Sequence, residues 1–204
     1  MSRAQTLLLR AQLAFWACVA LCFAVTGGGL SHNHGLSFYG GRWSTIIPWA
    51  VGFAACSFLI LRAADVLEED DRAFARCLRI NMVLLLAILF TPDTVDQFFY
   101  VAHIVASTAL FLFQAGVGLW LTVHSRRRLT LQLYVVQIGG GIVAGLSQLG
   151  WIDLLSLGIV VFQVAFGALL VSVPVGPGRE LAADGSGVRG HALGFGERLH
   201  RRPD

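Results

Sequence analysis

Two histidines lie one residue apart in a glycine-rich connector, the stretch TGGGLSHNHGLSFYGGRWSTIIPW from Thr26 to Trp49. Neutral imidazole is a common zinc ligand, and a loop, unlike a regular helix face, can direct His32 and His34 at one ion. Zinc needs further ligands, and no other ionisable side chain follows a recognised ligand spacing. The stretch is therefore also consistent with a lid over a binding site, or with a plain connector at a membrane surface.

A second set of polar side chains lies inside a long apolar segment. At 100° per residue, Tyr100, His103, Ser107 and Gln114 share an arc of about 60° with Asp96. The opposite side carries large apolar residues: Phe98, Val101, Val105 and Leu112. A polar group without a partner is costly in hydrocarbon, so the polar stripe should face the interior of a helix bundle.

Two interpretations of these polar groups remain open. In the first, glutamine, serine and histidine side chains only link helices, with hydrogen bonds of about 0.6 kcal/mol each. In the second they form a ligand site that the first connector covers, which brings His32 or His34 near Asp96, His103 or Asp153. The candidate ligand-binding residues are His32, His34, Tyr39, Arg42, Asp96, Tyr100, His103, Asp153 and Ser156. No catalytic residue is assigned, and no cofactor or bound metal is expected.

The composition indicates that these groups are positioned by membrane helices. Of the 204 residues, 56% are hydrophobic and only 13% are charged, and the mean hydropathy is +0.70. A transmembrane helix needs about 20 mostly apolar residues. Six segments qualify: about 6–26, 44–64, 74–91, 96–123, 129–149 and 154–174. The third qualifies only if Arg76 and Arg79 extend to the surface, because the apolar run Met82 to Phe90 is short.

The chain is therefore expected to be an all-α, polytopic membrane protein with a six-helix transmembrane bundle. Residues 1–174 form the transmembrane domain, and 175–204, rich in glycine and charge, form a disordered cytoplasmic tail. Cleavage of the first segment as a signal peptide is disfavoured, because Ala24 and Thr26 make a poor cleavage site. Thr91 or Asp93 should cap the fourth helix, and the Gly141 to Gly145 spacing should let the fifth approach a neighbour closely.

Basic residues predict the orientation. With the N-terminus inside, 14 of the 15 basic residues fall on the cytoplasmic side and only Arg42 falls outside, so both termini are cytoplasmic. All of them are arginine, which suggests a high-GC bacterial genome and hence the cytoplasmic membrane of a bacterium. Aromatic residues cluster near the expected outer boundary, as anchoring belts do: Tyr39, Trp43, Trp49, Phe98, Phe99, Tyr100 and Trp151.

The segments HGLSFYGGRWSTIIPW and TPDTVDQFFYVAHIVASTALFLF, with short connectors elsewhere, resemble those of a family of six-helix bacterial integral membrane proteins. More distantly, they are similar to the Frag/DRAM/Sfk-type membrane proteins. The resemblance covers the six helices but not the tail. It implies an extracytoplasmic first loop and no settled activity, and it singles out Tyr39, Gly40, Pro48 and His103.

The leading functional expectation is a non-catalytic protein that binds a lipid or another membrane protein through the outer half of the bundle. No nucleic acid partner is expected. One alternative is a metal-assisted lipid hydrolase that uses the outer histidines and aspartates. A second alternative is a transporter of protons or small solutes, which a histidine within the membrane permits.

The orientation is testable with reporter fusions. Fusions after Gly41 and Gly150 should report an extracytoplasmic location, and fusions after Glu69 and Arg127 a cytoplasmic one, because the arginines hold their connectors inside. Paired phosphatase and fluorescent-protein reporters provide the measurement. A cytoplasmic signal after Gly41 would contradict the assignment.

Overall fold

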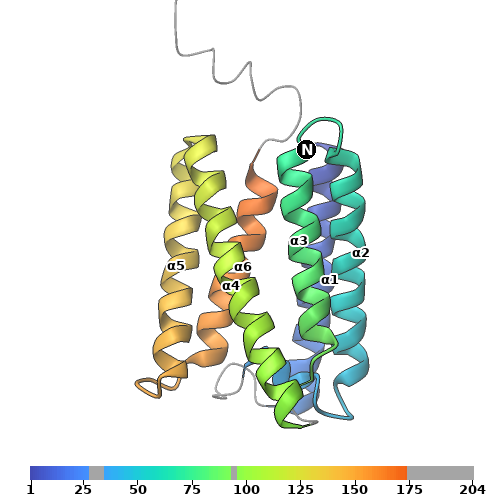
Figure 1. Ribbon diagram of the computed structural model, residues 1–204, viewed down its shortest axis with the longest axis vertical. Helices are drawn as coiled ribbons and strands as arrows, with labels where there is room; N and C mark the ends of the chain where they lie inside the picture. Colours follow the sequence, from blue (N-terminus) through green and yellow to red (C-terminus); the bar gives the residue numbers. More distant parts are fainter. Residues whose placement is uncertain (28–34, 93–95, 174–204) are drawn as a thin grey trace, which may run out of the picture.

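The computed structural model describes residues 1–27, 35–92 and 96–173 (Figure 1), and in these ranges the chain is helical, with no strand. The predicted tail, 175–204, lies outside them. Six α-helices and one short 3-10 helix, η2, make up the fold. They are α1 (Arg3–Thr26), η2 (Leu36–Tyr39), α2 (Ile46–Leu67), α3 (Arg72–Leu89), α4 (Gln97–Ser125), α5 (Arg128–Gln148) and α6 (Leu155–Ser172).

The six helices form a closed ring in which each packs against the next along the chain and α6 returns to α1. Successive helices run in opposite directions, so α1 ends where α2 and α4 begin (Figure 1). We call this end, which also carries η2, the η2 end. The six helices predicted from hydropathy are confirmed, each to within about three residues. Neighbouring helices are antiparallel because the connectors between them are short. A short connector cannot carry the chain back along the length of the bundle to start a parallel helix.

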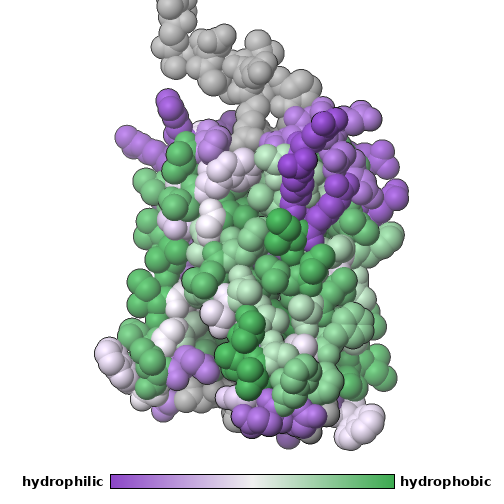
Figure 2. Space-filling model, in the orientation of Figure 1, coloured by the Kyte–Doolittle hydropathy of each residue, from purple (hydrophilic) through white to green (hydrophobic). Residues whose placement is uncertain are grey.

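Five of the helices are long and apolar enough to cross a membrane: α1, α2, α4, α5 and α6. Helix α3 reaches a similar length in the ring but carries Arg72, Arg76 and Arg79 in its first half. Arg79 pairs there with Asp65 at 3.3 Å and also with Glu68, beside the α2–α3 turn. Figure 2 shows apolar side chains over the middle of the visible face and polar ones at its two ends, which fits a membrane protein.

The ring closes where α1 meets α6. The side chain of Gln5 accepts a hydrogen bond from the Ser2 amide and completes a capping box at the start of α1. Its Nε2 donates to the carbonyls of Val171 and Val173, each at 3.1 Å. These carbonyls belong to the end of α6, where backbone acceptors lack partners within the helix. One glutamine therefore both begins the first helix and ties it to the last.

The predicted cap of the fourth helix is wrong. Thr91 ends α3, where its hydroxyl donates to the Ala87 carbonyl at 2.7 Å, and Asp93 lies outside the described residues. Asp96 caps α4 instead, because its Oδ1 accepts from the Phe99 amide at 2.9 Å. The run TPDTVDQ offers several capping residues, and local preference alone did not select among them.

Helices α5 and α6 approach closely through a different pair of positions from the predicted Gly141 and Gly145. A Cβ atom on Gly140 would lie 2.6 Å from the Phe162 amide nitrogen, and one on Gly158 would lie 2.5 Å from that of Ala144. Gly145 has open space around it, and Gly141 faces aromatic rings. The predicted spacing of four residues between small side chains is correct. The residues of α5 that make the contact, Gly140 and Ala144, each lie one position earlier than predicted.

Some of the aromatic residues predicted to form a belt are exposed, and others are buried. Trp43, Phe98 and Trp151 are largely exposed, with relative exposures of 94%, 74% and 74%. Tyr39 and Trp49 are instead buried, because η2 folds onto the end of the ring and packs there. Anchoring at a membrane surface therefore does not account for these two residues.

Replacing Gly140 by alanine should destabilise the protein by about 1–3 kcal/mol, because the new methyl group meets backbone atoms that cannot move alone. Gly139→Ala is the matched control: its Cβ meets nothing within 4 Å, so alanine there should leave stability unchanged or raise it slightly. Thermal unfolding of the purified protein in detergent measures the difference. Equal midpoints for the two variants would contradict the proposed α5–α6 contact.

Candidate ligand-binding site

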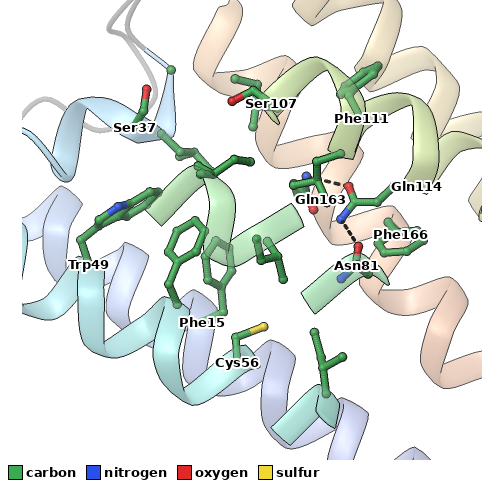
Figure 3. A pocket seen from close by; sticks show the side chains of 18 of the residues that line it. Phe15, Ser37, Trp49, Cys56, Asn81, Ser107, Phe111, Gln114, Gln163 and Phe166 are labelled. Atoms are coloured by element: carbon green, nitrogen blue, oxygen red, sulfur yellow. Dashed lines mark hydrogen bonds between the residues drawn. The ribbon is translucent and has the colours of Figure 1, made fainter. Parts of the chain in front are cut away.

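A cavity of about 150 Å³ lies inside the ring, between the η2 end and the middle of the bundle (Figure 3). We call it the central cavity. Five helices and the η2 segment contribute to its wall; α5 does not line it. The lining includes Gln12 and Phe15 of α1, Phe53 and Cys56 of α2, Asn81 and Leu85 of α3, His103 and Ser107 of α4, and Ile159 and Gln163 of α6.

Gln114 joins four helices at the inner end of this cavity. Its Nε2 donates to Asn81 Oδ1 on α3 at 3.0 Å, and its Oε1 accepts from Gln163 Nε2 on α6 at 2.9 Å (Figure 3). Its backbone carbonyl accepts from Gln137 Nε2 on α5 at 3.1 Å. We call these four residues the amide cluster. They supply complementary donors and acceptors where unpaired groups would be costly.

His103 lies about 9 Å along α4 from its first residue. The side chain is only 6% exposed, and its Nδ1 is 2.7 Å from the Thr91 carbonyl oxygen. A carbonyl can only accept, so Nδ1 carries the proton of this bond. In the neutral form of the ring, Nε2 is then an acceptor, and it has no hydrogen-bond partner among the described residues. The α3–α4 turn therefore fixes the histidine's tautomer.

Several further polar atoms in the cavity wall have no hydrogen-bond partner within the described part of the chain. Ser107 and the amide of Gln12 form no such bond, and the cluster leaves Asn81 Nδ2 and Gln163 Oε1 unused. Both donors and acceptors are thus available. No arginine, aspartate or glutamate is among the described residues that line the cavity.

Aromatic rings form the rest of the wall. On the α1–α2 side Phe15 and Phe53 lie edge to face at 5.3 Å, and Trp49 contacts Phe53 at 4.4 Å between centroids. Phe111 of α4 stacks on Phe162 of α6 at 3.9 Å with the planes 17° apart. These packed pairs hold the aromatic walls in place, and they suit an apolar ligand body.

A second cavity of about 270 Å³ adjoins the first at the η2 end, and we call it the side opening. It lies between the beginning of α2, at Ile46 and Ala50, and the end of α3, at Leu89 and Phe90. The two spaces share wall residues: Ser37, Trp49, Ile88 and His103. Phe90 is 71% exposed, so the opening reaches the outer surface of the ring.

The η2 segment is held firmly against the bundle. The Thr45 hydroxyl donates to the Tyr39 carbonyl at 2.7 Å, and the Tyr39 ring lies edge to face with Phe23 at 5.2 Å. Burial raises the pKa of the Tyr39 phenol above its usual range, and a hydrogen bond with Thr26 acts in the opposite direction. The phenol is therefore protonated at neutral pH, as it would be at its ordinary pKa. Tyr39 therefore shapes the η2 end but does not line the central cavity.

The predicted inward face of α4 is confirmed at its centre and wrong at its start. His103 and Gln114 are buried and Ser107 lines the central cavity. Tyr100 is 47% exposed, and Asp96 is exposed as the helix cap. The opposite side is exposed as expected at Phe98, Val101, Val105 and Leu112. The first turn departs from the pattern at the η2 end of α4, where Asp96 and Tyr100 are both exposed.

The remaining candidates are not brought together in the central cavity. Arg42 is exposed, with its guanidinium 4.6 Å from the centre of the Phe38 ring. Asp153 is exposed and Ser156 buried at the start of α6, and neither lines the central cavity. His32 and His34 lie outside the described residues, and so do the lid contacts predicted for them. Within the described ranges, no three His, Cys, Asp or Glu side chains form a metal-binding group.

No family model matches the chain, and comparisons with curated proteins and with solved structures find no significant match. The resemblance to six-helix membrane proteins stays a prediction. The function is therefore argued from the geometry.

Sequence reasoning missed two polar residues of the site. Asn81 is the one amide in a run of apolar residues on α3, and Gln12 is an amide among mostly apolar residues of α1. An isolated amide in a membrane segment needs a partner, which was the available signal. Asn81 was not predicted from this signal, because the prediction for α3 used only the length of its apolar run. Gln114 was predicted to face inward, but its hydrogen bonds to Asn81 and Gln163 were not predicted.

Gln114→Leu should lower the free energy of unfolding by about 1–2 kcal/mol. It removes two side-chain hydrogen bonds of about 0.6 kcal/mol each and leaves Asn81 and Gln163 without their shared partner. Gln148→Leu, at an exposed position on α5, is the control and should have little effect. Denaturant unfolding in detergent measures both. Adding Gln163→Leu to Gln114→Leu should cost less than the sum of the single changes, whereas strict additivity would contradict the pairing.

Proposed function

We propose that this protein binds a small, uncharged, lipophilic molecule of the membrane in its central cavity and does not transform it. The observation that carries the proposal is the combination of aromatic walls, neutral polar atoms without partners and no charged lining residue among those described. Binding cavities for small ligands are typically apolar with a few placed polar groups.

The absence of charge in the described lining defines the class of ligand. An ion moved from water into such a site would lose its hydration without gaining a counter-charge, which costs several kcal/mol. An uncharged molecule loses much less, and its apolar body gains about 25 cal/mol for each Å² that it buries. Neutral lipids and other membrane-soluble molecules meet both conditions.

The side opening supports entry from the membrane. It lies between α2 and α3 and is lined mostly by apolar side chains, including Ile46, Leu89 and the exposed Phe90. A lipophilic molecule in a bilayer can reach such an opening without crossing water. His103 lines both spaces, so a ligand that enters this way meets its first buried polar group there.

The proposal includes a location. We place the protein in the cytoplasmic membrane of a bacterium, with six membrane passes and both termini in the cytoplasm. The arginines of the described helices and turns lie toward the end opposite η2, except Arg42. Basic residues near helix ends are retained in the cytoplasm, so the η2 end faces outward and the central cavity occupies the outer half of the bundle.

Filling the cavity should abolish binding. Ser107→Phe places a ring in the central cavity, whereas Thr108→Phe puts the same ring on the exposed side of α4 as a matched control. Native mass spectrometry of protein released from bilayer nanodiscs should show an adduct of constant mass on the wild type and on Thr108→Phe. The adduct should fall at least tenfold in Ser107→Phe.

Two outcomes would contradict the proposal. An adduct retained fully by Ser107→Phe would place the ligand elsewhere, and a wild type without any adduct would remove the basis for a small-molecule ligand. Unfolding midpoints of both variants show whether the difference reflects folding instead. A destabilised Ser107→Phe can be replaced by Ser107→Leu, which fills less of the cavity and should give a smaller loss in the same direction.

A further inference from the structure

We infer that the central cavity selects ligands that carry a hydroxyl group, which donates its hydrogen to Nε2 of His103. The inference rests on the proposed function, since it names the chemistry of the ligand at the same site. It starts from one geometric fact: the Thr91 carbonyl occupies Nδ1 of His103 at 2.7 Å. The other ring nitrogen is therefore the one available to a ligand.

The turn between α3 and α4 sets the polarity of this contact. If Nδ1 were free, the ring could present either a donor or an acceptor to the cavity. Because a carbonyl accepts only, Nδ1 is the donor and neutral His103 presents an acceptor. A ketone, an ether or a hydrocarbon cannot donate to it. An acceptor left unpaired when a ligand displaces water costs free energy, so the cavity discriminates against such ligands.

Ser107 adds the second half of the recognition. It lies one helical turn after His103 on α4, and residues four apart have Cβ atoms about 5–6 Å from each other on the same face. Its hydroxyl lines the central cavity and has no hydrogen-bond partner among the described residues. A ligand hydroxyl near both residues can donate to His103 and accept from Ser107. A hydroxyl can do both at once with a single oxygen.

The rest of the cavity indicates the size of the attached body. The volume of about 150 Å³ equals that of a cavity known to hold a benzene ring. Phe15 and Phe53 lie on one side and Phe111 on another, so a ring-shaped apolar body is surrounded by aromatic rings. The ligand class is thus an uncharged alcohol or phenol, free or as the head of a larger lipid whose remainder extends through the side opening.

Two substitutions of His103 separate the two nitrogens. Asparagine places its amide near the position of Nδ1, keeps a donor for the Thr91 carbonyl and removes Nε2. Glutamine reaches the position of Nε2 with an amide oxygen and so restores an acceptor to the cavity. Neither variant changes the charge of a neutral site, and thermal midpoints report any difference in folding.

The test uses 4-bromophenol and 4-bromoanisole, which differ only in that the second replaces the hydroxyl hydrogen by a methyl group. Binding to the full-length protein in nanodiscs is followed by heavy-atom quenching of tryptophan fluorescence, since Trp49 lines the cavity. The cavity-filled Ser107→Phe variant gives the background from probe dissolved in the bilayer. The wild type should bind the phenol about five to ten times more tightly than the anisole.

His103→Asn should reduce this ratio to about one, and His103→Gln should restore at least part of it. Equal binding of the two probes to the wild type, above the Ser107→Phe background, would overturn the hydroxyl inference and leave the proposed function standing. The inference would also fail if His103→Asn kept the full preference. If neither probe bound above that background, both the inference and the proposed function would be overturned.

Discussion

The arrangement of this protein depends on the hydrogen bonds that converge on Gln114. Through its side chain and its backbone carbonyl, this residue connects α4 to α3, α5 and α6. The helices of a membrane bundle gain nothing from the hydrophobic effect against one another, because lipid is as apolar as their side chains. Directional polar contacts and close packing must then specify which helix lies beside which. An amide has both a donor and an acceptor, so the cluster constrains the rotation of α3, α4, α5 and α6 as well as their choice of neighbour.

Two modes of packing follow from this constraint and explain the central cavity. Helices α5 and α6 meet through glycines, with backbone atoms in near contact at Gly140 and Gly158. Helix α4 reaches α3 and α6 instead through amide side chains, which span a wider gap. The amides lie at one level along the bundle, so they do not fill the space between these helices on the η2 side of the cluster. Aromatic rings line this space without closing it. The central cavity lies on the η2 side of the level at which these polar side chains join the helices.

The same geometry determines which polar groups the central cavity presents to a ligand. Its inner end is closed by Asn81, Gln114 and Gln163, where Gln114 bonds to both of the others, while the part toward the η2 end presents His103 and Ser107. The tautomer of His103 is set by a backbone carbonyl just beyond the end of α3, so the turn and the site are one structural unit. This hydrogen bond makes Nε2 the acceptor of the neutral imidazole ring. The proposed bilayer-soluble ligand rests on two features: the described lining holds no Arg, Asp or Glu, and a side opening lies between α2 and α3.

The sequence by itself determined the number of helices, their bounds to within about three residues and the inward face of the middle of α4, because hydropathy and a period of 3.6 residues are local properties. Its polar pattern pointed inward at His103, Ser107 and Gln114. Only the tertiary structure decided which partners they meet. Asn81 and Gln114 are 33 positions apart, and Gln114 and Gln163 are 49 apart. Likewise, Asp96 rather than Thr91 became the cap of α4, and Gly140 rather than Gly141 the contact with α6. In each case several residues were locally suitable, and the packing of neighbouring helices selected one, because register and rotation are set by contacts between distant segments.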